Sequence, residues 1–228
     1  MKISNPFRDL TEFERRLWII SMGMVLLSFL FSGGGYLEAA ASLVGVTALI
    51  FVAKGYVTGQ VLTVVFSVLY GIISFFSQYY GEMITYLCMT APMAVMSIIS
   101  WARHPYKDSK EVEVSHLSPK KIIVMIILTA IVTAVFYFVL KALHNASLII
   151  STISVATSFI AVYLTFLRSP YYALGYAAND IVLIILWIIA GIEDISRLPM
   201  VMCFIMFLVN DLYGFYNWRK MRNRQEST

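Results

Sequence analysis

The stretch Asn179-Asp-Ile-Val-Leu-Ile-Ile-Leu-Trp187 places a carboxylate inside a run of residues that is apolar enough to cross a bilayer. The same combination recurs near the end of the chain, where Asn210-Asp211 lies within the apolar run Pro199–Trp218. A carboxylate at bilayer depth costs roughly 2.5 to 3.5 kcal/mol on insertion scales, so it normally faces a bundle interior or a water-filled cavity and has a function there. The two Asn-Asp steps therefore predict a polar site inside a helical membrane protein.

The composition of the whole chain agrees with this prediction. Of the 228 residues, 60% are hydrophobic and 13% are charged, and the mean hydropathy is +0.79. Soluble domains carry about 25% charged residues. Cys88 and Cys203 lie in apolar stretches without the spacing of a metal site or redox pair, and the histidines also lack ligand spacing. We therefore expect neither a metal nor a cofactor, and no separate soluble domain.

Eight apolar runs are long enough, or nearly long enough, to be membrane spans. The fold class predicted from them is an all-α polytopic membrane protein of about eight spans. The runs are Leu17–Phe31, Ala39–Ala53, Val57–Phe76, Met83–Trp101, Ile122–Leu140, Ala146–Leu167, Tyr172–Ala190 and Pro199–Trp218.

The distribution of positive charge predicts the orientation of these spans, because short cytoplasmic loops retain Lys and Arg. With eight spans and both termini in the cytoplasm, only Lys141 and Arg197 of the chain's 17 Lys and Arg fall on the outer side. An odd number of spans would break this alternation. We therefore predict a multi-pass protein of the inner (plasma) membrane. The net charge of +4 then describes a basic inner face in the lipid bilayer, not a nucleic-acid-binding surface.

Two further features belong to the predicted inner side. Trp18, Trp101 and Trp218 lie where inner interfaces are expected, and the belt of interfacial aromatic residues explains them. The longest connection, residues 102–121, is polar and charged, and we predict a solvated loop there.

An internal repeat is also indicated. Residues 39–104 and 146–222 each contain three apolar runs, a tight basic turn after the first run, an acidic outer hairpin (Glu82 in one, Glu193 and Asp194 in the other) and an ending with Trp. One span separates the two units, so both would cross in the same direction. Parallel repeats of this kind form one transporter architecture, with the substrate site near midplane between the halves. The predicted parts are an extra N-terminal helix at 17–31, a first unit at 39–101, a linking helix at 122–140 and a second unit at 146–218.

The candidate site residues follow from helical spacing. Asp180 and Trp187 are seven residues apart and share a helical face, with Asn179 one step round. In the last span Asn210, Tyr213 and Asn217 form one polar stripe, with Asp211 on its shoulder, and we expect these groups to face inward together. The third span offers Ser67 and Tyr70, with Ser74 at the same spacing. Every acidic residue other than Asp180 and Asp211 is assigned to a terminus, a connection or a helix end.

Structural roles are the alternative for each of these residues. Amides hold membrane helices together for roughly 0.6 to 2 kcal/mol each, which would explain Asn179 and Asn217. An interfacial position would explain Trp187, and packing would explain Tyr70 and Ser67. Two carboxylates at midplane are harder to explain in this way, because a structural hydrogen bond does not require an ionisable group.

The chemistry of the site limits the ligand. Two carboxylates without a Lys or Arg inside the spans imply a cationic ligand, a coupling ion or one shared proton. Nearby aromatic residues favour a flat ring, because a planar cation could stack on Trp187 or Tyr213. A cationic heteroaromatic nucleoside has all of these features.

At these residues the sequence resembles a known family. The stretch from Asn179 to Trp187, followed by Phe-Leu-Val-Asn210-Asp-Leu-Tyr-Gly-Phe-Tyr-Asn217-Trp-Arg-Lys, is similar to the C-terminal half of PnuC-type vitamin transporters. The resemblance extends to Tyr-Gly-Glu82-Met and to Ser-Trp101-Ala-Arg. It covers most of the chain and is sharpest in the last two spans.

This resemblance implies a SWEET-like arrangement of two three-helix bundles joined by a linking helix, a homotrimer, and facilitated uptake of nicotinamide riboside, a precursor of NAD. It also implies that a cytoplasmic kinase traps the substrate by phosphorylation. The family's binding Asn residues fall on Asn179 and Asn210. A family tryptophan one turn after the first Asn is replaced by Leu183, and only Trp187 lies near the second tryptophan position, which bears on substrate identity because relatives take thiamine, riboflavin or deoxynucleosides.

The function predicted from the sequence is facilitated transport of a nicotinamide riboside-like vitamin by rocking of the two units, with Pro92 and Gly214 as flexing points. One alternative is a transporter of another cationic or aromatic vitamin, such as thiamine, coupled to protons or sodium through Asp180 and Asp211. A second is an intramembrane enzyme that uses the two Asp residues as an acid-base pair, which would require the carboxyl groups to lie within hydrogen-bonding distance.

Overall fold

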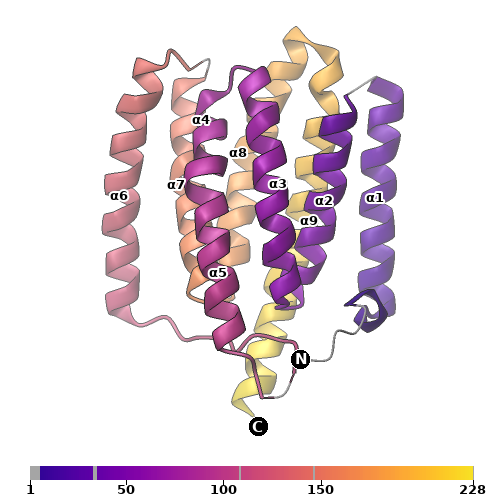
Figure 1. Cartoon of the computed structure of the whole chain (residues 1–228), viewed down its shortest axis with the longest axis vertical. Helices are drawn as coiled ribbons and strands as arrows, with labels where there is room; N and C mark the ends of the chain where they lie inside the picture. The colour runs from indigo at the N-terminus through magenta and orange to yellow at the C-terminus, as the bar shows by residue number, and fades with distance from the viewer. Residues whose placement is uncertain (1–5, 33–34, 108, 146, 228) are drawn as a thin grey trace.

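The protein is a bundle of long, roughly parallel helices in the computed structural model (Figure 1). The structure describes residues 6–32, 35–107, 109–145 and 147–227. Within these residues the only extended pairing is two isolated β-bridges. The α-helices are α1 (Glu12–Ser32), α2 (Tyr36–Ala53), α3 (Val57–Phe76), α4 (Tyr80–Ile84), α5 (Ala91–Arg103), α6 (Pro119–Ala142), α7 (Leu148–Phe166), α8 (Tyr172–Glu193) and α9 (Leu198–Glu226).

The helices correspond to the eight predicted spans. Seven segments of the described chain are long and apolar enough to cross a membrane, and α1 is not among them. α1 has 21 residues, and its first turns contain Glu12, Glu14, Arg15 and Arg16. The predicted start of the second unit, Ala146, lies outside the described residues. The all-α fold class is confirmed.

The fourth span contains a change in helical geometry. It runs from Tyr80 to Arg103, and a π-helical turn, η2 (Thr85–Thr90), separates α4 from α5. Pro92 follows immediately in the first turn of α5. Proline lacks an N–H, and its ring collides with the carbonyl four residues earlier, so a widened turn before it relieves that conflict. Pro92 therefore lies beside the irregular turn of this span.

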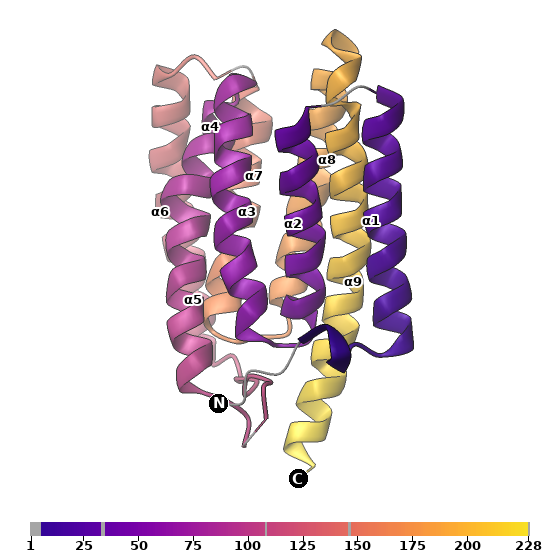
Figure 2. The same ribbon diagram turned by 45° about the vertical axis from the view of Figure 1, so that its right-hand side comes forward.

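Six spans form a closed ring. α2 contacts α3, α3 contacts the fourth span, the fourth span contacts α7, α7 contacts α8, α8 contacts α9, and α9 returns to α2. α1 packs outside this ring against α9 and α2, and α6 packs outside it against α7 (Figures 1 and 2). The ring has an interior in which polar side chains can be enclosed.

The two predicted units meet through matching contacts. Trp101 at the end of the first unit donates its indole N–H to the backbone carbonyl of Thr165 at 3.0 Å, and Trp218 at the end of the second donates to Val52 at 2.9 Å. Both indoles are buried, so the expectation that they are interfacial aromatics is wrong. Each tryptophan joins the last helix of one unit to the first helix of the other. This reciprocity supports the internal repeat, which stays a prediction.

The residues just before the tryptophans repeat the pattern. Ser100 donates its hydroxyl to the carbonyl of Phe166 at 3.1 Å, and Asn217 donates its amide to the carbonyl of Ala53 at 2.8 Å. In both cases the acceptor is the residue directly after the one whose carbonyl accepts from the neighbouring tryptophan. Asn217 therefore has a contact that helps to close the ring.

The connection after α5 is largely exposed in its described residues, as expected of a solvated loop, but several hydrogen bonds attach it to the bundle. Val112 is buried, and its N–H donates to the carbonyl of Gly55 at 3.0 Å. The N–H of Ser115 donates to the carbonyl of Arg168 at 3.0 Å, and Gln225 exchanges hydrogen bonds with Val112 and Val114. Backbone hydrogen bonds thus hold a polar sequence in place. The connection therefore links the turn at Gly55 and the turn at Arg168 to the end of α9.

Candidate functional site

The two aspartates of the Asn-Asp steps meet inside the ring. Asp180 on α8 and Asp211 on α9 are each 3% exposed, and their carboxyl groups lie within hydrogen-bonding range of each other. Oδ2 of Asp180 has no hydrogen-bond partner among the described residues. The sequence prediction that both carboxyl groups face the bundle interior is borne out by this placement.

A small cavity lies in front of this pair. Its volume is about 40 Å³, and residues of α2, α3, η2, α8 and α9 line it. Besides Asp180 and Asp211, its polar lining consists of Gln60, Thr63, Tyr86, Thr90 and Tyr176. Ligand pockets typically enclose about 300 to 1,000 Å³. In this conformation the interior is therefore too small to hold a nucleoside.

No cation balances the acid pair in the described part of the chain, because every ion pair there involves other acidic residues. Two carboxylates in contact at low dielectric repel each other strongly unless a proton or a positive charge lies between them. The pair can therefore bind a cation, share one proton, or accept hydrogen bonds from a ligand.

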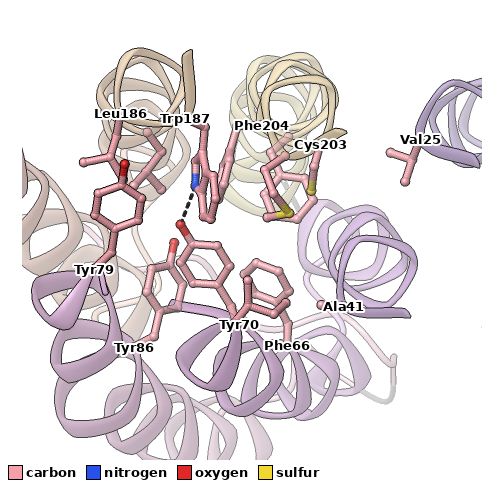
Figure 3. Packing of buried hydrophobic residues seen from close by; sticks show 14 of the residues in the cluster. Val25, Ala41, Phe66, Tyr70, Tyr79, Tyr86, Leu186, Trp187, Cys203 and Phe204 are labelled. Carbon is pink, nitrogen blue, oxygen red and sulfur yellow. Dashed lines mark hydrogen bonds between the residues drawn. The ribbon is translucent and has the colours of Figure 1, made fainter. Parts of the chain in front are cut away.

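An aromatic layer borders the cavity. Tyr70 of α3 and Trp187 of α8 meet across the ring, where the indole N–H donates to the phenol oxygen at 2.8 Å (Figure 3). Tyr86 packs against Tyr70 with ring centroids 4.4 Å apart, and Phe66 and Phe204 contact the same ring. The sequence placed Tyr70 and Trp187 in the site, and the structure brings them into direct contact.

A second pocket lies on the other side of this layer. It encloses about 180 Å³ between the ends of α2, α3, α8 and α9, and Trp187 forms part of its wall. Glu38, Asp194 and Arg197 also line it. The Ser196 hydroxyl and backbone N–H donate to Asp194 at 2.7 and 3.0 Å, and these hydrogen bonds lower the pKa of Asp194. The aromatic layer thus separates an outer pocket from the inner cavity.

Asn179 faces α7 and not the acid pair. Its Oδ1 lies 3.2 Å from the hydroxyl of Ser154, 2.9 Å from that of Thr157 and 3.0 Å from that of Ser158. One helical step therefore separates a carboxyl group that faces α9 from an amide that faces α7. Asn179 and Asp180 do not point into one space.

The sequence prediction missed the burial of Glu82, and also that of Glu14, which it assigned to the N-terminus. Glu82 is fully buried within α4, accepts a hydrogen bond from Ser154 at 3.2 Å, and has no partner for Oε1 within the described chain. The assignment of Glu82 to an outer hairpin is wrong, because the fourth span begins at Tyr80 and not at Met83. Extending that span by one turn, to the 24 residues it has, would have placed this acid inside the bundle.

The polar stripe of α9 does not face the cavity. Asn210 donates its amide to Ser21 of α1 at 3.0 Å and to the carbonyl of Met206 at 2.7 Å, and its Oδ1 is buried without a partner in the described structure. Tyr213 donates to Glu14 at 2.9 Å. The expectation that the stripe and Asp211 face inward together is therefore wrong, because the extra helix α1 covers the stripe from outside the ring.

The remaining predicted residue, Ser67, is buried on α3, and its hydroxyl donates to the carbonyl of Thr63 at 2.8 Å within the same helix. Glu14 itself forms a buried ion pair with Lys54 at 3.0 Å. Asn217, Tyr213 and Ser67 thus have contacts within the fold, and no ligand is needed to satisfy their polar groups.

The distance condition for the enzyme alternative is met, since the two aspartates lie within hydrogen-bonding range. An acid-base pair alone does not define a reaction, and a nucleophile or oxyanion site beside it would be needed. The comparisons below favour transport over catalysis.

The sequence matches a family of transporters. A family profile described as "Nicotinamide mononucleotide transporter" matches residues 35–220. A protein of Neisseria mucosa named nicotinamide riboside transporter PnuC is 26% identical over 224 residues, which cover 96% of this chain and 85% of the relative. The protein of the same name from Haemophilus influenzae is 24% identical over 192 residues, which cover 83% of this chain and 81% of the relative.

The fold matches a solved structure as well. A crystal structure described as the vitamin B3 transporter PnuC superposes with a TM-score of 0.83 at 24% identity, over 95% of this chain and 94% of that chain. The likeness extends over the whole helical bundle, and the protein is a multi-pass membrane protein. Because the family profile covers most of the sequence, this chain belongs to the nicotinamide mononucleotide transporter family.

Proposed function

We propose that the protein carries nicotinamide riboside across the membrane by facilitated transport. The family description names the mononucleotide, whereas the two curated relatives are named for the riboside. The contact between Asp180 and Asp211 favours the riboside over the mononucleotide as the substrate. The riboside is a pyridinium cation without a phosphate, so an acidic interior attracts it, and the same interior repels the phosphate of the mononucleotide.

The residue roles follow from their surroundings. Asp180 and Asp211 balance the pyridinium charge, and Trp187 and Tyr70 supply aromatic faces for the ring. Asn179 binds a ribose or carboxamide group. Asn210 can add an acceptor through its unpartnered Oδ1 once the bundle rearranges.

The size of the cavity implies a conformational change during transport. A nucleoside does not fit in about 40 Å³, whereas the outer pocket already encloses about 180 Å³. Alternating access by rocking of the two three-helix units would open one side at a time and move the aromatic layer between the two pockets. Pro92 beside the π-helical turn, and Gly214 against the hydroxyl of Tyr172, are the proposed flexing points.

Uptake into proteoliposomes tests this function. Labelled nicotinamide riboside should enter with saturable kinetics, and unlabelled mononucleotide should compete poorly. Asp211→Asn should raise the KM for the riboside about tenfold, corresponding to about 1.4 kcal/mol of lost charge interaction, with less effect on an uncharged nucleoside. Asn210→Ala is a second test of the site, and Glu12→Gln, at an exposed ion pair, is the matched control. Absence of saturable riboside uptake contradicts the proposal.

Proton-coupled transport of a cationic vitamin such as thiamine is the second candidate, because the close approach of Asp180 and Asp211 also suits one shared proton. Uptake measured with and without an imposed pH gradient separates the two. Accumulation above the external concentration that depends on the gradient supports coupling. Equilibration to equal concentrations supports facilitated transport, with trapping by a cytoplasmic kinase.

We place both termini in the cytoplasm and the protein in the inner membrane, on the basis of the charge distribution. We also propose a homotrimer. α6 packs mainly against α7, and Leu140 is its only buried residue within the described structure, so much of its surface has room for neighbouring copies or lipid. Cross-linking in native membranes tests the trimer, and labelling of a cysteine added beside Thr228 from either side tests the orientation.

A further inference from the structure

One serine lies between two acceptors. Oγ of Ser154 on α7 is 3.2 Å from Oε2 of Glu82 on α4 and also 3.2 Å from Oδ1 of Asn179 on α8. A hydroxyl group has a single hydrogen, so Ser154 can donate to only one of them at a time. The two acceptors belong to different three-helix units. Ser154 therefore links a buried acid of the first unit to a proposed substrate contact of the second.

The surroundings of Glu82 contain phenols, and no cation is paired with it within the described residues. Tyr70 of α3, Tyr86 of η2 and Tyr79, just before α4, interact electrostatically with it. Leu140 of α6 and Ser151 of α7 lie beside the neighbouring Gly81, and Ser154 of α7 donates to Glu82 itself. No Lys, Arg or His of the described ranges forms an ion pair with Glu82. The carboxyl group can exist with or without a proton. The two forms differ in how strongly they accept the hydrogen of Ser154.

With a proton on Glu82, the hydrogen of Ser154 is free for Oδ1 of Asn179, which Ser158 and Thr157 also approach. The oxygen of the carboxamide is then fixed toward α7. Its NH₂ group therefore points away from α7 and can donate to a ligand.

Without the proton, the carboxylate takes the hydrogen of Ser154, because a hydrogen bond to a charged acceptor is stronger. Thr157 can place its own hydrogen on the backbone carbonyl of Ile153 at 3.1 Å. Ser158 can turn its hydrogen to a backbone carbonyl one turn earlier in α7, as serines within helices do. The hydroxyl oxygens of Ser154, Thr157 and Ser158 then act as acceptors, and the NH₂ end of Asn179 faces them. The two ends of a carboxamide have nearly the same shape, so hydrogen-bond partners decide which way it faces.

We propose that Glu82 is a positioning residue that acts through Ser154 to set which end of the Asn179 carboxamide faces the substrate. The protonated form presents NH₂ to an acceptor on the substrate, such as a carboxamide or hydroxyl oxygen, and loss of the proton weakens binding. This inference rests on the proposed function in so far as Asn179 contacts the substrate.

Kinetics at equal pH on both sides of the membrane test the proposal without involving a gradient. The KM of the wild-type protein for labelled nicotinamide riboside should rise about tenfold between about pH 5 and about pH 9, the loss of roughly one hydrogen bond, while the maximal rate changes little. Glu82→Gln and Ser154→Ala should each abolish this tenfold rise, so that any pH dependence still present in these two variants reports on the Asp180–Asp211 pair alone. Ser158→Ala is the matched control: it removes a hydroxyl from Asn179 without touching Glu82, so KM should rise but keep its pH dependence.

Wild-type pH dependence that persists in Glu82→Gln, or that disappears in Ser158→Ala, overturns the proposal and leaves the proposed function intact. Infrared spectroscopy supplies a second readout that needs no substrate. The C=O stretch of the protonated Glu82, identified by its loss in Glu82→Gln, should shift in Ser154→Ala and stay unchanged in Ser158→Ala. If the wild type takes up no riboside, the proposed function fails, and the infrared result alone decides whether Ser154 responds to Glu82; an unshifted band overturns the link.

Discussion

The indole N–H of Trp187 donates a 2.8 Å hydrogen bond to the phenol oxygen of Tyr70, across the interior of the ring. Both side chains are buried, at 1% and 0% exposure, so neither polar group has water as a substitute partner. The bond joins α3 of the first predicted unit to α8 of the second predicted unit. It therefore holds the aromatic layer closed between the inner cavity and the outer pocket.

Tyr70→Phe should destabilise the protein by about 1 to 3 kcal/mol, because the buried Trp187 N–H loses its acceptor. Trp187→Phe should also destabilise it. The double variant should lose less than the sum of the two, since neither polar group is left behind. Thermal unfolding in detergent measures these changes. Additive losses would contradict a direct interaction between the two side chains.

Trp101→Phe and Trp218→Phe should each cost about 1 to 3 kcal/mol, and the two costs should be similar, because each removes one indole hydrogen bond to a backbone carbonyl of the other unit. The measurement is unfolding by denaturant or heat. Trp18→Phe is the comparison. The indole of Trp18, on α1 outside the ring, donates to a threonine hydroxyl at 3.2 Å and not to a backbone carbonyl. A large loss for one ring tryptophan and none for the other would argue against a structural repeat.

Glu14→Gln should cost about 3 kcal/mol, because it leaves the ammonium group of Lys54 without its partner in a mostly buried position. The carboxylate also accepts from Tyr213 and caps α1 through the N–H of Thr11 at 2.7 Å. Glu12→Gln, in an exposed ion pair two residues earlier, should change stability by less than about 0.5 kcal/mol. Equal effects of the two substitutions would show that burial of the Glu14 pair has no energetic importance.

Gly45→Ala should destabilise the contact between α2 and α9 by about 1 to 3 kcal/mol, because a Cβ there would overlap with the ring of Phe207. Phe207→Leu should restore part of the loss by making room. Gly23→Ala on α1 is the control: a Cβ there meets nothing within 4 Å, and alanine favours helix by up to about 1 kcal/mol. Thermal unfolding of the three variants checks this. A Gly45→Ala protein as stable as the wild type would mean that α9 does not pack against α2 at this point.

Helix positions and the inward orientation of Asp180 and Asp211 could be predicted from the sequence, because apolar runs locate spans and an unpaired acid avoids lipid. The environment of Asn210 could not. The spacing of a helix shows which residues share a face, but not which helix covers that face, and here the extra helix α1 covers it. Glu82 was missed for a different reason: a boundary error of one turn moves a charged residue from a loop into the bundle.

The contact between α2 and α9 has a consequence for the synthesis of the protein. These two helices are the first and last members of the ring, and Phe207 of the last helix packs directly against Gly45 of the first. During translation the side of α2 that packs against α9 therefore stays uncovered until the final helix has been made. Ring closure is then a late, post-insertion step, and a ribosome stalled before residue 198 would leave an incomplete bundle for membrane proteases to recognise.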